Sequence, residues 1–147
     1  LRGFLRDRPH LRVAAENLTG VQFAGSVPLD RLSDLLTAAD VHLVSMRDEA
    51  DGCLVPSKAY GILAAGRPCI MVGPRQSDVG RLVEAGGAGE NIEIGEGARL
   101  AGVLAQLRND PAYAAALGRA GRAYYENHLG RDRCVARIIE TLEGNGQ

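Results

Sequence analysis

The chain has 147 residues, which suits one domain, and folding at that size buries roughly 68–70% of the unfolded chain's surface. Its 17 Lys and Arg residues nearly balance its 18 Asp and Glu residues, so nothing indicates a nucleic-acid surface or an acidic substrate. No apolar run reaches the roughly 18–20 residues that a membrane span requires.

The three cysteines are an odd number without a Cys-x-x-Cys pair or a histidine at metal-ligand spacing: Cys53, Cys69 and Cys134. We therefore expect reduced thiols in a cytoplasmic protein, and neither a disulfide nor a metal site. The chain has no Trp and only 4 Tyr and 2 Phe, against 19 Gly. This composition favours a pocket that holds its ligand through backbone amides at tight turns rather than by aromatic stacking.

Predicted strands and helices alternate along the first two thirds of the chain. Residues 1–8 are typical of a helix, and residues 14–17 of the end of another. A strand near 21–24 is followed by a turn, and Pro28 then opens a helix with one apolar stripe, formed by Leu29, Leu32, Leu35 and Leu36. A second strand is predicted near 41–44. A polar loop separates it from a helix that starts at Pro56-Ser57-Lys58 and stops at Gly66 and Pro68.

A third strand is predicted near 69–72, a helix over 78–85, and a fourth strand near 91–94. The rest of the chain predicts helices, one with apolar residues from Leu100 to Leu107, one starting at Asp110-Pro111, and a last one striped from Val135 to Leu142. We therefore predict an α/β fold, with a doubly wound, mainly parallel, Rossmann-like sheet and a helical tail. We expect this tail to cover the sheet, although its last helix could reach a neighbouring domain.

Ligands of such sheets bind at the carboxyl ends of the strands, which directs attention to loops 25–28, 45–57 and 73–77. The most informative stretch runs from Asp51 to Ile70. A loop that ends in Ser at a helix start presents N–H groups and the positive end of the helix dipole, which suit a diphosphate, and Lys58 adds a charge. Taken alone, these residues favour a structural interpretation, with Ser57 as an N-cap and Lys58 in solvent.

The complete pattern resembles the retaining glycosyltransferases of GT-B architecture, in the family 4-like group that includes many bacterial polysaccharide enzymes. The resemblance runs from about Val21 to Gly89 and rests on five segments: Val21 to Gly25, Leu29 to Leu36, Ala39-Asp40, Val41 to Ser45, and Ala64-Ala65-Gly66-Arg67-Pro68. The Pro-Ser-Lys before the helix is similar to the branch that assembles cell-surface polysaccharides.

The resemblance implies the C-terminal, donor-binding half of a two-domain hexosyltransferase-type enzyme, with residues 1–147 as a single nucleotide-sugar-binding domain. Such an enzyme moves a sugar from a nucleotide-diphosphate sugar to a cell-surface polysaccharide or glycolipid acceptor, without a cofactor or an obligatory metal. The acceptor glycan or lipid-linked glycan would bind an N-terminal domain that we expect to be absent here. The resemblance further implies a cytoplasmic protein that could associate with the inner face of the membrane.

Two departures from the family pattern change the expected site. The pair of glutamates that the family uses to grip the donor would fall on Cys53 and Gly61, which are not carboxylates. Donor contacts are then expected from backbone groups and loop side chains, and the predicted donor-binding residues are Ser26, Val27, Arg47, Gly52, Cys53, Leu54, Val55, Ser57 and Lys58. Secondly, residues 12–17 leave no room for the strand, Gly-x-Gly turn and helix that precede Val21 in the family, so we expect an incomplete N-terminal part.

Two other functions stay open. A nucleotide-sugar epimerase built on the same two-domain plan would need carboxylates in its cleft, which this half does not display. A degenerate sugar-nucleotide-binding module without catalysis is consistent with Cys53 and Gly61. A receiver-like signalling domain is disfavoured, because Asp40 precedes its strand and Ser45 follows it. The three histidines form no catalytic constellation, and His42 is expected to be a satisfied interior or edge residue.

Overall fold

The computed structural model describes residues 2–3, 13, 15, 18–23, 25, 27–53 and 55–144. The chain divides into two compact units, Leu1–Leu35 and Leu36–Gln147. In the first unit, β1 (Arg2–Gly3) pairs in parallel with β2 (Gln22–Phe23). The predicted strand near 21–24 is thus present at Gln22–Phe23. The helix predicted over residues 1–8 is wrong at Arg2–Gly3, where pairing with a distant segment overrides local helix propensity.

The 3-10 helix η1 (Leu29–Arg31) follows Pro28 and continues directly into α2 (Leu32–Ala38), as the leucine spacing predicts. Ala15 is helical, in agreement with the predicted helix end over residues 14–17, whereas residues 14, 16 and 17 lie outside the described part.

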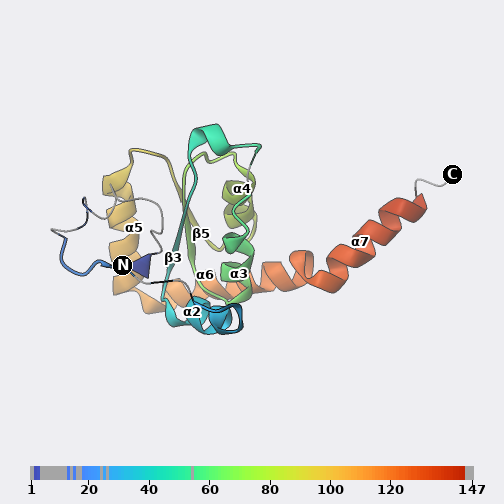
Figure 1. The fold of residues 1–147 in the computed structure, drawn as a ribbon, viewed down its shortest axis with the longest axis horizontal. Helices are drawn as coiled ribbons and strands as arrows, with labels where there is room; N and C mark the ends of the chain where they lie inside the picture. The colour runs from blue at the N-terminus through green and yellow to red at the C-terminus, as the bar shows by residue number, and fades with distance from the viewer. Residues whose placement is uncertain are drawn as a thin grey trace. The chain divides into compact units, whose positions relative to one another are not determined.

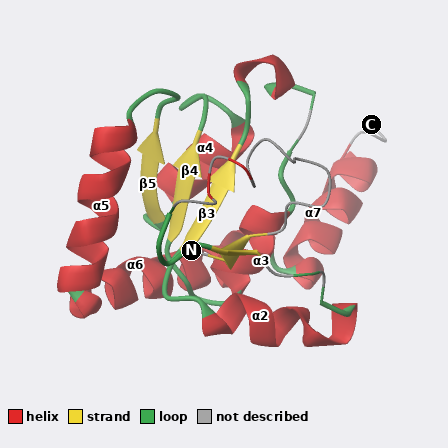
Figure 2. Ribbon diagram, turned by 60° about the vertical axis from the view of Figure 1, so that its left-hand side comes forward, coloured by secondary structure: helices red, strands yellow, loops and turns green. Residues whose placement is uncertain are grey.

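The second unit is built on a parallel sheet with the strand order β3-β4-β5, formed by β3 (His42–Ser45), β4 (Cys69–Val72) and β5 (Gly89–Ile92). The three strand arrows point the same way (Figure 2). The fourth predicted strand lies two residues earlier than expected, and Ile94 is exposed beyond its end. Its register is set by Gly89 pairing with Cys69, where a Cβ on Gly89 would lie only 2.0 Å from the Cys69 carbonyl oxygen.

Helices cover both faces of this sheet because alternate residues of a strand point to opposite faces. Cys69 and Met71 pack in a cluster with α3 (Lys58–Ala64) and α4 (Asp78–Ala85). Ile70 packs in a second cluster with α5 (Gly97–Asn109). All three of these strand residues are fully buried, and burial of each apolar side chain stabilises the fold by about 1.5–3 kcal/mol. The predicted α/β fold with a parallel sheet flanked by helices is therefore confirmed.

Helix α6 (Pro111–Tyr124) contributes to both layers (Figure 1). Its first turns pack on the α5 side through Tyr113 and Leu117, and its end packs on the other side through Tyr124. The predicted start signal is confirmed, since the Asp110 carboxylate accepts from the Tyr113 N–H at 2.9 Å and Pro111 occupies the first turn.

Glycine allows α6 to lie against the turn that ends α3. A Cβ at Gly118 would lie 2.2 Å from the Gly66 carbonyl oxygen, and one at Gly121 would lie 2.9 Å from Ala88 Cβ. Arg122 on the same helix donates to the Ala64 carbonyl at the end of α3, where a positive charge also complements the helix dipole.

The chain continues through a π-helical turn, η3 (Tyr125–Leu129), into α7 (Arg131–Gly144), which extends away from the sheet (Figure 1). Of the two alternatives predicted for the last helix, covering the sheet is wrong for α7, whereas contact with a neighbouring domain stays a prediction. The α7 stripe of Val135, Ile138, Ile139 and Leu142 is 47–72% exposed, because α7 packs against η3 rather than on a sheet face. None of the described helices is long and apolar enough to cross a membrane.

The contact between α6 and α3 predicts opposite effects for two helical glycines. Gly118→Ala should lower the free energy of unfolding by about 1–3 kcal/mol, because the new methyl group overlaps a backbone oxygen that cannot move freely. Gly102→Ala in α5 is the matched control, with nothing within 4 Å of its added Cβ, and should raise that free energy by about 0.5–1 kcal/mol. Urea unfolding of both variants tests this, and equal effects would contradict the close helix contact.

Candidate functional site

The carboxyl ends of β3, β4 and β5 lie at one edge of the sheet, and the backbone ladder continues into the loops that follow. Met46 donates its N–H to the Val72 carbonyl at 3.0 Å, and Gly73 donates to the Ile92 carbonyl at 2.9 Å. The beginnings of the loops after β3 and β4 are thus fixed by the sheet itself. This is the edge at which parallel sheets bind ligands.

The loop after β4 is in direct contact with the loop after β3. Gly73 has a φ of +153°, and a Cβ there would lie 2.5 Å from the Met46 carbonyl oxygen. A side chain at position 73 would force the two loops apart, so glycine is required here. Gly73 begins one of the three loops expected at the ligand edge, but it is not among the predicted site residues, although the Gly-Pro pair directly after an apolar strand is a recognisable turn signal.

The 73–77 loop folds closely over the first turn of α4. Ser77 is fully buried and its hydroxyl accepts from the Gly80 N–H at 3.1 Å, which makes Ser77 a true N-cap. A Cβ at Gly80 would lie 2.3 Å from the Arg75 carbonyl oxygen. The 73–77 loop therefore packs directly against the first turn of α4.

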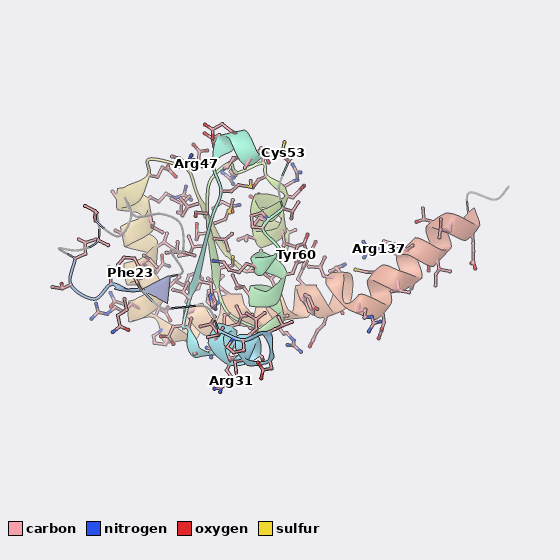
Figure 3. All side chains as sticks on the ribbon, viewed as in Figure 1. Phe23, Arg31, Arg47, Cys53, Tyr60 and Arg137 are labelled. Carbon is pink, nitrogen blue, oxygen red and sulfur yellow. The ribbon has the colours of Figure 1, made fainter. Side chains whose placement is uncertain are left out.

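The longer loop after β3 carries most of the predicted donor-binding residues. It contains a 3-10 turn, η2 (Asp48–Ala50), and Gly52 with a φ of +73°, a conformation that glycine adopts without strain. Figure 3 shows Arg47 and Cys53 beside this turn, at the end of the sheet beyond α3. The structure brings together the predicted site residues Arg47, Gly52, Cys53, Val55, Ser57 and Lys58 in this one segment of the second unit.

Three further predicted site residues are Ser26, Val27 and Leu54. Val27 is exposed and belongs to the first unit, whereas Ser26 and Leu54 lie outside the described residues.

The start of α3 differs from the structural interpretation of the sequence. Ser57 is at the N-cap position as predicted, but it has helical angles, φ −55° and ψ −21°, and its side chain makes no capping hydrogen bond within the described chain. The Ala59 N–H instead donates to the Pro56 carbonyl at 3.1 Å, and the Tyr60 N–H to the Ser57 carbonyl at 3.2 Å. These amides are engaged by tight backbone turns, and the exposed Ser57 hydroxyl has no hydrogen-bond partner among the residues that the structure describes.

Lys58 is directed toward the sheet. Its ammonium donates to the Leu43 carbonyl in β3 at 2.9 Å, although the side chain remains exposed. In β3, the amides of His42 and Met46 donate toward β4, so the intervening Leu43 directs its carbonyl away from β4. Lys58 satisfies this carbonyl from the outer side of the strand.

Position 61 is explained by a close contact with α2. A Cβ at Gly61 would lie 3.1 Å from Leu36 Cδ1, so a larger side chain would require Leu36 to shift. Position 61, where the resemblance described above implies a glutamate, is thus occupied by a glycine packed against a leucine in this chain.

Two titratable groups in the sheet are structural. His42 is half-buried and its Nε2–H donates to the Leu36 carbonyl at 2.8 Å, as expected for a satisfied edge residue, and burial lowers the pKa of His42. Burial raises the pKa of the Cys69 thiol to about 12, so this group stays protonated near neutral pH. Within the described residues, no three His, Cys, Asp or Glu side chains gather in a way that could hold a metal ion.

One curated protein that is similar to this chain has a name that states a function. The chain is 28% identical over 105 residues to the probable glycosyltransferase WbjE of Pseudomonas aeruginosa. The match covers 71% of this chain but 26% of that protein, so the chain spans about a quarter of the length of the curated relative it matches. No protein-family model matches the chain. No solved structure matches it either.

The two serines before α3 and α4 give a test of this loop geometry. Ser77→Ala should lower the free energy of unfolding by about 1 kcal/mol, since it removes a buried capping bond. Ser57→Ala should change it by less than about 0.5 kcal/mol, because no capping bond is lost. Urea unfolding measures both, and an effect of Ser57→Ala as large as that of Ser77→Ala would contradict the observed start of α3.

Proposed function

We propose that this chain is the donor-binding half of a glycosyltransferase, which holds a nucleotide-diphosphate sugar at the carboxyl edge of the β3-β4-β5 sheet. The similarity to a probable glycosyltransferase carries this proposal, because a parallel α/β sheet alone is shared by many unrelated functions. The sequence pattern of the GT-B transferases supports the same assignment independently of the fold.

The geometry of the second unit supports a donor site between β3 and α3. The loop after β3 is anchored to the sheet at Met46, touches the next loop at Gly73, and turns sharply at Gly52. In a retaining transferase without an obligatory metal, the departing diphosphate is stabilised by positive side chains and hydrogen-bond donors. Arg47 and the free Ser57 hydroxyl are the side chains of this loop that can supply such contacts.

The acceptor side of the reaction requires more than these residues. We propose that a preceding domain of a longer protein binds a cell-surface polysaccharide or lipid-linked glycan acceptor, in the cytoplasm at the inner face of the membrane. The relative named above is long enough to contain such a domain, since the match covers 26% of it.

A second function is favoured by one observation. Neither Cys53 nor Gly61 is a carboxylate, and Gly61 is packed against Leu36, so this chain lacks the acidic groups with which related enzymes grip the donor. A sugar-nucleotide-binding module without catalysis would have the same features. It differs from the transferase in turnover but not in donor binding.

Calorimetric titration with a panel of UDP-, GDP- and dTDP-sugars tests the donor site in the longer protein that contains this chain. One nucleotide should bind with a dissociation constant on the order of 1 μM to 1 mM, the range typical of enzyme substrates. The parent nucleosides, which lack phosphate, should bind more weakly. Absence of heat with every member of the panel would overturn the proposal.

An assay of the chain by itself with the donor that binds and a crude glycan acceptor should give no transfer above background, because a GT-B site forms between two domains. The longer protein serves as the positive control. Transfer by the chain alone would mean that the active site lies elsewhere. If the longer protein binds the donor but transfers no sugar, the binding module is favoured. If the donor sugar is itself converted, an epimerase is favoured.

A further inference from the structure

We infer that Arg47, and not Lys58, supplies the positive charge that meets the donor's diphosphate, and that Lys58 is a positioning residue that holds α3 against β3. This inference rests on the proposed function, because it assigns roles within the proposed donor site. The sequence pattern alone favours Lys58, which stands in the Pro-Ser-Lys motif at a helix start.

Five described cations lie at the carboxyl edge of the β3-β4-β5 sheet, on its loops or in the first turns of the following helices: Arg47, Lys58, Arg75, Arg81 and Arg99. A diphosphate at this edge must obtain its positive partner from this set or from backbone donors. The hydrogen bonds that each of the five already makes therefore decide which of them is free to bind an anion.

Lys58 is already bound within the protein. Its ammonium lies 2.9 Å from the Leu43 carbonyl, 15 positions earlier in the chain, and so connects the first residue of α3 to the middle of β3. To reach a ligand in the loop, Lys58 would have to leave a carbonyl that has no partner in β4. Its charge thus fixes where α3 begins and positions the loop that precedes it.

The three arginines after β4 and β5 are paired with carboxylates. Arg75 binds Glu84 at 2.9 Å, Arg81 binds Asp78 at 2.7 Å, and Arg99 binds Glu96 at 3.1 Å and Glu90 at 3.4 Å. Exposed pairs of this kind are worth only about 0–1 kcal/mol, so they do not hold the side chains rigidly. The adjacent negative charge nevertheless reduces the attraction of each guanidinium for an anionic ligand.

Arg47 differs from the other four cations. It lies two residues beyond the end of β3 and is exposed, and its side chain makes no hydrogen bond or ion pair with any described residue. Its fork of N–H donors suits bidentate binding of phosphate oxygens.

The negative charge of the surrounding loop makes anion binding there depend more strongly on Arg47. The residues that follow it include Asp48, Glu49 and Asp51, three carboxylates within four positions. Without Arg47 this segment would present only negative charge to an approaching diphosphate. Arg47 is therefore needed both to attract the ligand and to offset the repulsion of its neighbours.

Arg47→Gln in the longer protein tests the inference by calorimetric titration with UDP, GDP, dTDP and inorganic pyrophosphate. The variant should bind the preferred nucleoside diphosphate about 10- to 100-fold more weakly, the factor carried by one hydrogen bond to a charged group. Its affinity for the parent nucleoside and its thermal midpoint should stay unchanged, because Arg47 contacts only phosphate and supports no other side chain. Arg108→Gln at the end of α5, also exposed and without a described partner, is the matched control and should bind as wild type does.

Lys58→Met tests the other half of the inference, because it should change stability first. Lys58→Met should lower the thermal midpoint, because it removes the hydrogen bond to the Leu43 carbonyl. Lys58→Arg can still reach this carbonyl and should keep the thermal midpoint and the donor affinity of the wild type. If Arg47→Gln binds nucleoside diphosphates as wild type does, the role given to Arg47 is wrong but the proposed function stands. The same conclusion follows if both Lys58 variants lose affinity for nucleoside diphosphates at unchanged stability. A wild-type protein that binds none of the four probes would overturn the proposed function together with the role given to Arg47.

Discussion

The parallel ladder of β3, β4 and β5 is the constraint on which the rest of the second unit depends. Its central strand is buried on both faces, so Cys69 and Met71 must be covered from one side and Ile70 from the other. Helices on both sides follow from that requirement. The same ladder extends past the strand ends through Met46 and Gly73, so the sheet that forms the core also fixes the start of the loops at the candidate site.

Close approach of backbone to backbone is the second recurring feature. At Gly73, Gly89 and Gly118, an added Cβ would lie within 2.5 Å of a carbonyl oxygen of a distant segment. Each contact joins elements that would otherwise be separated by a layer of side chains: two loops, two strands and two helices. The abundance of glycine in this chain therefore serves its packing as well as its turns, which composition alone did not distinguish.

Most of the positively charged side chains at the candidate site are used within the protein. Lys58 is bound to a strand carbonyl, and three arginines are paired with carboxylates. Arg47 stands beside three acidic residues, and its side chain has no partner among the described residues. In the donor site proposed above, the positive charge therefore depends on one side chain, and positions 53 and 61 carry Cys and Gly rather than carboxylates.

The sequence by itself determined the elements whose signals are local. The helix over 78–85, the buried strand over 69–72 and the Asp110-Pro111 helix start agree with the structure, because burial periodicity and capping act between residues a few positions apart. The short strands at Arg2–Gly3 and Gly89–Ile92 were missed or shifted, since a strand of two to four residues is defined by its partner. Only the tertiary structure decided the roles of Ser57 and Lys58. The sequence placed both at a helix start, but the Ser57 hydroxyl makes no cap because its backbone has helical angles, and the Lys58 ammonium binds a strand carbonyl 15 positions away.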